Sequence, residues 1–242
     1  MQFPIACFDD FYKDPDRVRE WALGLEYGKH IDGTYPGVRT QCLSGIDENF
    51  YEMSCRKFLG MFDDFDKPPD QVSWKIRTYF QKIWRFSPDP NSIRNKGWIH
   101  SDTNVILAGV VYLNPNSDPD AGTSIYTEKK DAIIPEWMMY EEGVPNKSPF
   151  VQDVLQSGFS CAIDSIKKYD KALKENNDMY ELTLEVKNKY NRMIGYDGDQ
   201  WHSQSTYWMD NEEFRLTQVY FLEELNCSNQ KFPNVRCERY GI

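Results

Sequence analysis

The strongest constraint on the fold is the segment at residues 105–114, VILAGVVYLN. It is an almost continuous apolar run, rich in β-branched residues, and it ends in the turn sequence Asn114-Pro115-Asn116. A short apolar run bounded by a turn predicts a buried strand. Because a buried strand needs partners on both sides, we expect a sheet to organise the second half of the chain.

Further strand-like segments support this expectation. They are rich in β-branched and aromatic residues and occur at 72–84, 119–127, 180–186, 191–198 and 214–225. In one of them, Leu182, Leu184 and Val186 alternate with polar residues, which predicts a strand with one buried face.

Helices are predicted before and within this β pattern. Asp14-Pro15 is a cap followed by proline at the first helical position, and apolar residues then recur at helical spacing up to residue 25. Residues 51–62 predict a second helix. Residues 135–180 interrupt the strands with prolines and then with a charged, helical stretch, IDSIKKYDKALKENND.

These elements predict a mostly β protein with flanking helices (α+β), either an antiparallel β-sandwich or a jelly roll. We expect a single domain over 1–242, with helical support at about 1–70 and a β core at about 72–130 and 180–225. The stretch at about 135–180 is too short for a core of its own. We expect it to be an insertion that covers the site as a lid.

Charge and hydrophobicity exclude some classes of function. The formal net charge is −10, so a nucleic-acid partner would meet net repulsion. No stretch approaches the roughly 20 apolar residues that span a bilayer, so we expect no membrane-spanning segment and no membrane partner. The first residues lack a basic leader, and we therefore expect a cytoplasmic protein. The oligomeric state cannot be predicted from the sequence.

Two histidines and one aspartate form a possible metal site, and we call His100, Asp102 and His202 the triad. His100 and Asp102 are two residues apart in a segment of β character, where alternate side chains share a face. His202 follows a predicted strand that a sheet could bring beside them. Two imidazoles and one carboxylate leave positions open on a metal, as in non-haem Fe(II) oxygenases. A solvated histidine with a capping aspartate is the alternative.

Arg215 favours the metal site over this alternative. It lies thirteen residues after the second histidine of the triad, in a predicted strand. Its alternation places Thr217, Val219 and Phe221 on the same face. An arginine beside apolar side chains needs an anionic partner, because an unpaired buried charge is costly, and its planar fork suits a carboxylate. A structural ion pair with one of the 38 acidic residues is the alternative.

Taken in order, HSD (100–102), WH (201–202) and RLT (215–217) resemble the iron(II)- and 2-oxoglutarate-dependent oxygenases of the double-stranded β-helix fold. More narrowly, VVYLNPNSDPDAGTSIY (110–126) and NRMIGYDGDQWHS (191–203) are similar to the prolyl-hydroxylase-like branch. FDDFYKDPDRVREWAL (8–23) and YPGVR (35–39) resemble a subfamily of these oxygenases in bacteria and their phages.

The resemblance implies a role for each matching position. The triad would bind Fe(II), and no other residue would be catalytic. Arg215 would pair with the distal carboxylate of 2-oxoglutarate, and Thr217 and Tyr112 would also contact it. An ordinary core tyrosine is the alternative at Tyr112. The chain departs from the pattern in its long gap between Asp102 and His202 and in Ala-Gly-Thr where a doubled glycine is common. Neither departure affects a ligand.

The implied activity is hydroxylation of a C–H bond, coupled to conversion of 2-oxoglutarate and O₂ to succinate and CO₂. Asp102 leaves no ligand position for a halide, which favours hydroxylation over halogenation. The substrate could be a peptidyl or free amino acid or another small molecule. Two other classes stay open: a β-sandwich binding protein with a vestigial metal site, and a cupin-like metalloenzyme that does not use 2-oxoglutarate.

Four further residues have a functional and a structural interpretation. Trp98 and Trp201 precede the two histidines and could line a pocket, although core packing explains them better. Tyr35 and Arg39 could contact a substrate, but a Pro-Gly turn explains their loop equally well.

Overall fold

Two antiparallel sheets organise the protein in a computed structural model, which describes residues 4–29, 35–62, 72–135, 154–155 and 159–227. The larger sheet has the strand order β1 (Ala6–Phe8), β7 (Met193–Asp197), β4 (Leu107–Tyr112), β9 (Phe214–Cys227), β3 (Val72–Trp84) and β2 (Val38–Arg39). The smaller sheet has the order β6 (Tyr180–Val186), β5 (Thr123–Glu128) and β8 (His202–Gln204).

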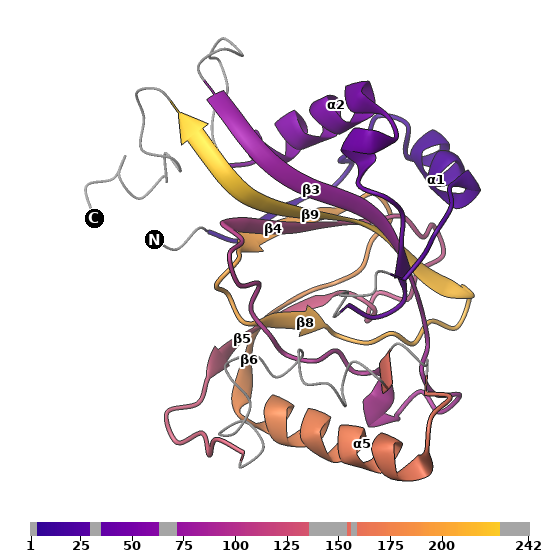
Figure 1. The fold of residues 1–242 in the computed structure, drawn as a ribbon, viewed down its shortest axis with the longest axis vertical. Helices are drawn as coiled ribbons and strands as arrows, with labels where there is room; N and C mark the ends of the chain where they lie inside the picture. Colours follow the sequence, from indigo (N-terminus) through magenta and orange to yellow (C-terminus); the bar gives the residue numbers. More distant parts are fainter. Residues whose placement is uncertain (1–3, 30–34, 63–71, 136–153, 156–158, 228–242) are drawn as a thin grey trace.

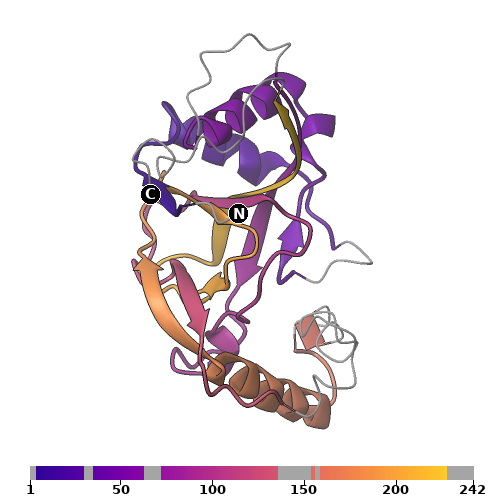
Figure 2. The ribbon, with the colours of Figure 1, turned by 90° about the vertical axis from the view of Figure 1, so that its left-hand side faces the viewer.

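Helices cover the outer sides of these sheets (Figure 1). Two of them, α1 (Pro15–Gly24) and α2 (Glu48–Leu59), lie over the larger sheet, and α5 (Ile163–Asp178) lies beyond the smaller one. Short 3₁₀ turns occur at Leu43–Gly45 and Ile93–Asn95. Turned by 90°, the view shows the two sheets facing each other between the helices (Figure 2). The prediction of a mostly β protein with flanking helices and antiparallel sheets is confirmed.

The helix starts follow from local capping. The side chain of Asp14 accepts a hydrogen bond from the backbone N–H of Arg17, and proline occupies the first turn of α1. Asp47 accepts from the backbone N–H of Phe50 in the same way, so α2 begins three residues earlier than its apolar pattern predicts. These bonds satisfy backbone donors that the first helical turn leaves without partners.

The longest strand pair, β3 with β9, separates two environments. Alternation along β9 places Leu216, Tyr220 and Leu222 in the core beneath α1 and α2. The opposite face carries Val219 and Phe221 toward the smaller sheet. The same strand therefore supports the helical layer on one side and lines the space between the sheets on the other.

Close contact between α2 and the larger sheet depends on two paired glycines. Gly109 of β4 lies opposite Gly195 of β7. A Cβ atom at Gly109 would lie 2.5 Å from the Met193 side chain and 2.7 Å from the Phe58 ring, and one at Gly195 would lie 2.7 Å from the Phe62 ring. The missing side chains leave room for these aromatic rings directly on the sheet.

One prediction about the strands is wrong. Leu182 and Leu184 were expected on a buried face of β6, but they are 57% and 41% exposed. Val186, at the end of the same strand, is buried. The reason is topological: β6 is an edge strand of the smaller sheet, and a bulge shifts its register with β5 near its middle. No described helix is long and apolar enough to cross a membrane.

We predict that Gly109→Ala lowers the free energy of unfolding by about 1–3 kcal/mol, because the added methyl group overpacks the interface with α2. Urea unfolding measures this change. Gly24→Ala is the matched control, since a Cβ atom there meets nothing within 4 Å. Equal stability of Gly109→Ala and the wild type would show that α2 is not held closely against the sheet.

Candidate metal centre

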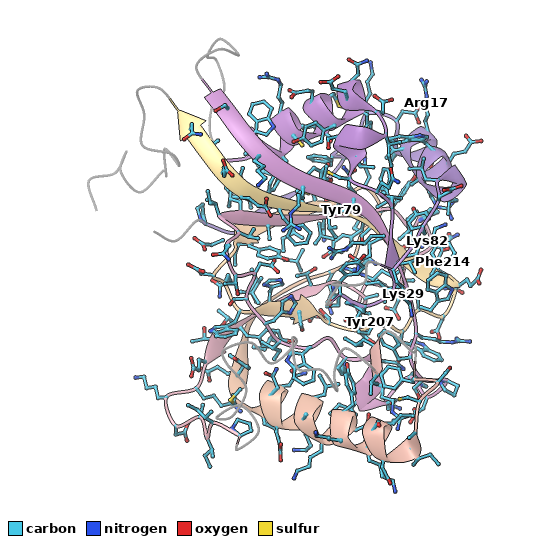
Figure 3. All side chains as sticks on the ribbon, in the orientation of Figure 1. Arg17, Lys29, Tyr79, Lys82, Tyr207 and Phe214 are labelled. Carbon is cyan, nitrogen blue, oxygen red and sulfur yellow. The ribbon has the colours of Figure 1, made fainter. Side chains whose placement is uncertain are left out.

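A cavity of about 550 Å³ lies between the two sheets. The larger sheet lines it with side chains that include Tyr79, Val219 and Phe221, and the smaller sheet contributes Thr123 and Ser203. Tyr79 and Tyr207, which line the cavity from its two sides, are labelled in Figure 3. The triad lines the same cavity, so a bound metal ion would be accessible to a small molecule inside it.

The structure brings the triad together. His100 and His202 form an isolated antiparallel bridge, exchanging backbone hydrogen bonds of 3.0 and 2.9 Å. Asp102 sits in the following turn, where its backbone N–H donates to the carbonyl of Gly198. One potential ligand atom of each triad residue lies within 4.8 Å of the other two. The bridge thus links two segments about one hundred residues apart in the sequence.

Hydrogen bonds fix which nitrogen of each histidine faces the site. Nδ1 of His100 lies 2.8 Å from the carbonyl oxygen of Trp98, and Nδ1 of His202 lies 2.8 Å from that of Gln200. A carbonyl oxygen only accepts, so Nδ1 carries the proton in both rings. Nε2 is then the free lone pair, and it faces Asp102 at 3.8 Å from His100 and 3.5 Å from His202. Metal-binding histidines typically donate a hydrogen bond in this way from the ring nitrogen that does not bind the metal.

Burial keeps His202 neutral. It lowers the pKa of His202 to about 4, the nearby His100 lowers it further, and Asp102 opposes the shift. A neutral imidazole with a free Nε2 is the form that binds a metal ion. The carboxylate of Asp102 adds the negative charge that a divalent cation requires.

Arg215 lies on the face of β9 that points between the sheets, as its alternation predicts. It is only 1% exposed. Its Nε donates to the carbonyl of Ala121 at 3.2 Å, and its guanidinium lies 5.3 Å from the ring centre of Tyr112. No carboxylate of the described residues lies within 4.0 Å of it, so the structural ion pair considered above is not found there. Burial lowers the pKa of Arg215, and the nearby tyrosines, Tyr112 first, oppose that shift.

Two buried polar atoms on the same face of β9 are unsatisfied. Nη2 of Arg215 and Oγ1 of Thr217 have no hydrogen-bond partner within the described residues. Both side chains project from the same face of β9, two residues apart. Buried polar groups are nearly always paired, so this pair indicates a missing acceptor, and the charge of Arg215 indicates that it is an anion.

Aromatic side chains connect the triad with Arg215. The ring of Tyr196 lies 4.6 Å from that of His202. The pKa of Tyr196 is raised by burial and by the charge of Asp102, and the charge of Arg215 acts in the opposite direction. Tyr112 donates its hydroxyl proton to Oγ1 of Thr123 at 2.7 Å and so joins the two sheets beside Arg215.

Helix α5 supports the segment that carries His100. The side chain of Asn177 accepts from the backbone N–H of Ile99 at 3.1 Å and donates to the carbonyl of Gly97 at 2.9 Å. Asn176 donates to the carbonyl of Ile99 at 3.0 Å. The C-terminal end of α5 therefore fixes the backbone next to the first histidine of the triad.

The remaining candidates divide between the cavity and the core. Tyr35 and Arg39 both line the cavity. Trp98 lines it as well and packs at 5.8 Å on Tyr169 of α5. Trp201 is not among the cavity-lining residues and packs on Tyr180 instead, at 4.8 Å between ring centres, so core packing explains it. Much of the predicted lid, at 136–153 and 156–158, lies outside the described residues.

Sequence reasoning missed Tyr196 and Asn177. The predicted strand at 191–198 contains Tyr196, but alternation does not say which of its faces meets the triad. Asn177 lies in the predicted charged helix, where asparagine is an unfavourable interior residue. Its place near a helix end, followed by a strand, is a signal that could have drawn attention to it.

Several solved structures resemble this one at low sequence identity. HygX from Streptomyces hygroscopicus, with nickel and 2-oxoglutarate bound, has 9% identity and a TM-score of 0.49, covering 93% of this chain and 83% of its own. A 2OG-Fe(II) oxygenase family oxidoreductase from Burkholderia pseudomallei has 11% identity and a TM-score of 0.44, covering 90% and 81%. A prolyl-4-hydroxylase from Pseudomonas putida has 9% identity and a TM-score of 0.40, covering 91% and 92%.

The fold and the site together define a mostly β protein with a candidate two-histidine, one-carboxylate metal centre between its sheets. No curated protein sequence matches the chain. A family model does match residues 1–221, and the chain belongs to that family, DUF6445, which is described as a family of unknown function.

We predict that Asn177→Ala weakens binding of a divalent metal such as Co(II) at least about tenfold, because it releases the backbone that positions His100. Calorimetric titration of the metal-free protein measures the affinity. Lys171→Ala is the matched control, since this exposed side chain on the same helix contacts no part of the site. Unchanged metal affinity in Asn177→Ala would show that α5 does not support the triad.

Proposed function

We propose that this protein is an Fe(II)- and 2-oxoglutarate-dependent dioxygenase that hydroxylates a small molecule or an amino acid, free or peptidyl. The observation that carries the proposal is the unsatisfied pair formed by Nη2 of Arg215 and Oγ1 of Thr217. A carboxylate satisfies both atoms and neutralises the buried charge. Arg215 and Thr217 do not line the cavity themselves, but the triad does, and so does Val219, which follows Thr217 on the same face of β9. In the proposal, one molecule with a metal-chelating end and a distal carboxylate reaches both features.

The triad residues fit the metal. Two neutral imidazoles and one carboxylate on one side of an ion leave the other side open, and this ligand set suits Fe(II). His100 and His202 present Nε2, and Asp102 presents its carboxylate, without any change in the hydrogen bonds that hold the rings. The donor set therefore requires no rearrangement of the side chains.

The protein contributes binding, orientation and exclusion of water. Bound Fe(II), with 2-oxoglutarate and O₂, supplies the oxidising chemistry that yields succinate, CO₂ and a hydroxylated product. Arg215 and Thr217 fix the distal carboxylate of 2-oxoglutarate, and Tyr112 packs beside it. Tyr196 fills the space against His202 and limits water there. Placing the reactants and keeping them dry is the usual contribution of a protein to cofactor chemistry.

We assign the finer fold as a double-stranded β-helix of the prolyl-hydroxylase-like branch. Two facing antiparallel sheets with a site between them support this assignment. In the proposed domain plan, α1 and α2 support one sheet and the insertion covers the site. Leu155 and Tyr169, from that insertion, line the cavity and support its role in substrate binding.

The two alternative classes are less well supported. A vestigial site does not require the hydrogen bonds from Nδ1 of both histidines, which leave Nε2 free to bind a metal ion. A metalloenzyme that does not use 2-oxoglutarate leaves Arg215 buried with an unsatisfied Nη2. Neither class accounts for both features at once.

We predict that anaerobic titration of the metal-free protein with Fe(II) and then 2-oxoglutarate produces the visible charge-transfer band of the chelate. His202→Ala should abolish the band. Arg215→Gln should raise the Kd for 2-oxoglutarate at least about 100-fold, since breaking a buried charge pair costs about 3–5 kcal/mol. Thr217→Val, which removes a neutral hydrogen bond, should raise it about fivefold.

Circular dichroism and thermal unfolding of each variant separate loss of binding from loss of folding. Absence of the band in folded wild-type protein would contradict the proposal and favour a vestigial site. A band with unchanged affinity in Arg215→Gln would show that 2-oxoglutarate binds without this arginine.

A further inference from the structure

Another arginine, which lines the cavity itself, has no acidic partner within 4.0 Å among the described residues. Arg39, at the end of β2, lines the cavity together with the triad. Its Nε donates to the side chain of Gln81 at 3.1 Å, and no carboxylate of the described residues lies within 4.0 Å of it. By contrast Arg77, which lines the cavity nearby, forms an ion pair with Glu223. The charge of Arg77 is therefore paired with a carboxylate, whereas that of Arg39 is not.

Aromatic rings surround the Arg39 guanidinium. Its central carbon lies 3.8 Å from the ring centre of Tyr35, 5.1 Å from that of Phe221 and 5.6 Å from that of Tyr79. These ring contacts and the hydrogen bond from Nε to Gln81 involve no acceptor for the terminal N–H groups of Arg39. A planar carboxylate is the acceptor that matches this geometry and a single positive charge.

Arg39 and Arg215 are separate binding positions. Arg39 is in register with Gln81 and, through it, with Thr217, and its guanidinium lies 5.1 Å from the ring centre of Phe221, four residues further along β9. Arg215 lies two residues from Thr217 in the opposite direction, and its guanidinium lies 5.3 Å from the ring centre of Tyr112 instead. Arg39 lines the cavity that the triad also lines, whereas Arg215 does not.

The charge on Arg39 persists at neutral pH although the side chain is shielded from water. Burial lowers its pKa to about 10, and Tyr35 and Asp102 oppose that shift. A partly desolvated cation without a counter-ion attracts an anion more strongly than a solvated one does. The groups packed around it are three aromatic rings and an amide, and none of these can neutralise it.

We propose that the primary substrate is an organic acid and that Arg39 binds its carboxylate within the aromatic collar of Tyr35, Tyr79 and Phe221. This inference rests on the proposed function, because it takes the 2-oxoglutarate position to be at Arg215. The aromatic collar favours an acid with an apolar or aromatic body. Arg77 offers no second unpaired charge, because it is paired with Glu223. The carboxylate, held at Arg39, orients the rest of the substrate toward the triad.

The test compares an acid with its uncharged isostere. 3-Phenylpropionate, 3-phenylpropanamide and phenyl phosphate are titrated by ligand-observed NMR into the Zn(II)-loaded protein, with and without saturating 2-oxoglutarate. The acid should bind at least tenfold more tightly than the amide in both conditions. Arg39→Gln should abolish this difference, and Arg39→Lys should retain part of it. Arg77→Gln, the matched control, should change the Kd for the acid less than threefold.

Several outcomes would overturn the inference. They are equal binding of acid and amide by the wild type, no binding of the acid, or unchanged acid binding in folded Arg39→Gln. Tighter binding of phenyl phosphate than of the acid would show that the site is built for phosphate instead.

A separate measurement distinguishes this inference from the proposed function. The Kd for 2-oxoglutarate in the Fe(II) titration should be the same in Arg39→Gln and the wild type. A large increase would assign Arg39 to the cosubstrate and overturn the inference. Failure of the wild type to bind 2-oxoglutarate would instead contradict the proposed function, whatever the NMR titration shows.

Discussion

The buried charge of Arg215 is the constraint on which this account depends. A guanidinium that is 1% exposed and has an unsatisfied Nη2 is costly unless an anion binds it. The surrounding tyrosines and Thr217 supply shape and neutral hydrogen-bonding groups, but no negative charge. The proposed function supplies that anion as the distal carboxylate of a ligand whose other end binds a metal ion at the triad.

Both sheets contribute residues to the site. The larger sheet supplies Arg215 from β9, while His202 begins β8 of the smaller sheet and bridges to His100. The hydroxyl of Tyr112 joins the sheets next to Arg215. Helix α5 then holds the backbone before His100 through Asn177. Elements far apart in the sequence are thus fixed relative to one another by a few buried polar contacts.

Much of this arrangement could be predicted from the sequence, because it follows from local rules. Strand alternation placed Arg215 and Thr217 on one face, and capping residues marked the start of α1. The same rule failed for Leu182 and Leu184, since alternation shows which residues share a face but not whether another layer covers that face. The role of Asn177 and the unpaired charge of Arg39 depend on partners from distant segments, which no local pattern reveals.

The most direct test is a crystal structure of the protein with Fe(II) and 2-oxoglutarate, prepared without oxygen. The account predicts iron on Nε2 of His100 and His202 and on the carboxylate of Asp102. It also predicts the distal carboxylate of 2-oxoglutarate within hydrogen-bond distance of Nη2 of Arg215 and Oγ1 of Thr217. Iron at another position, or 2-oxoglutarate bound with Arg215 still unpaired, would contradict it.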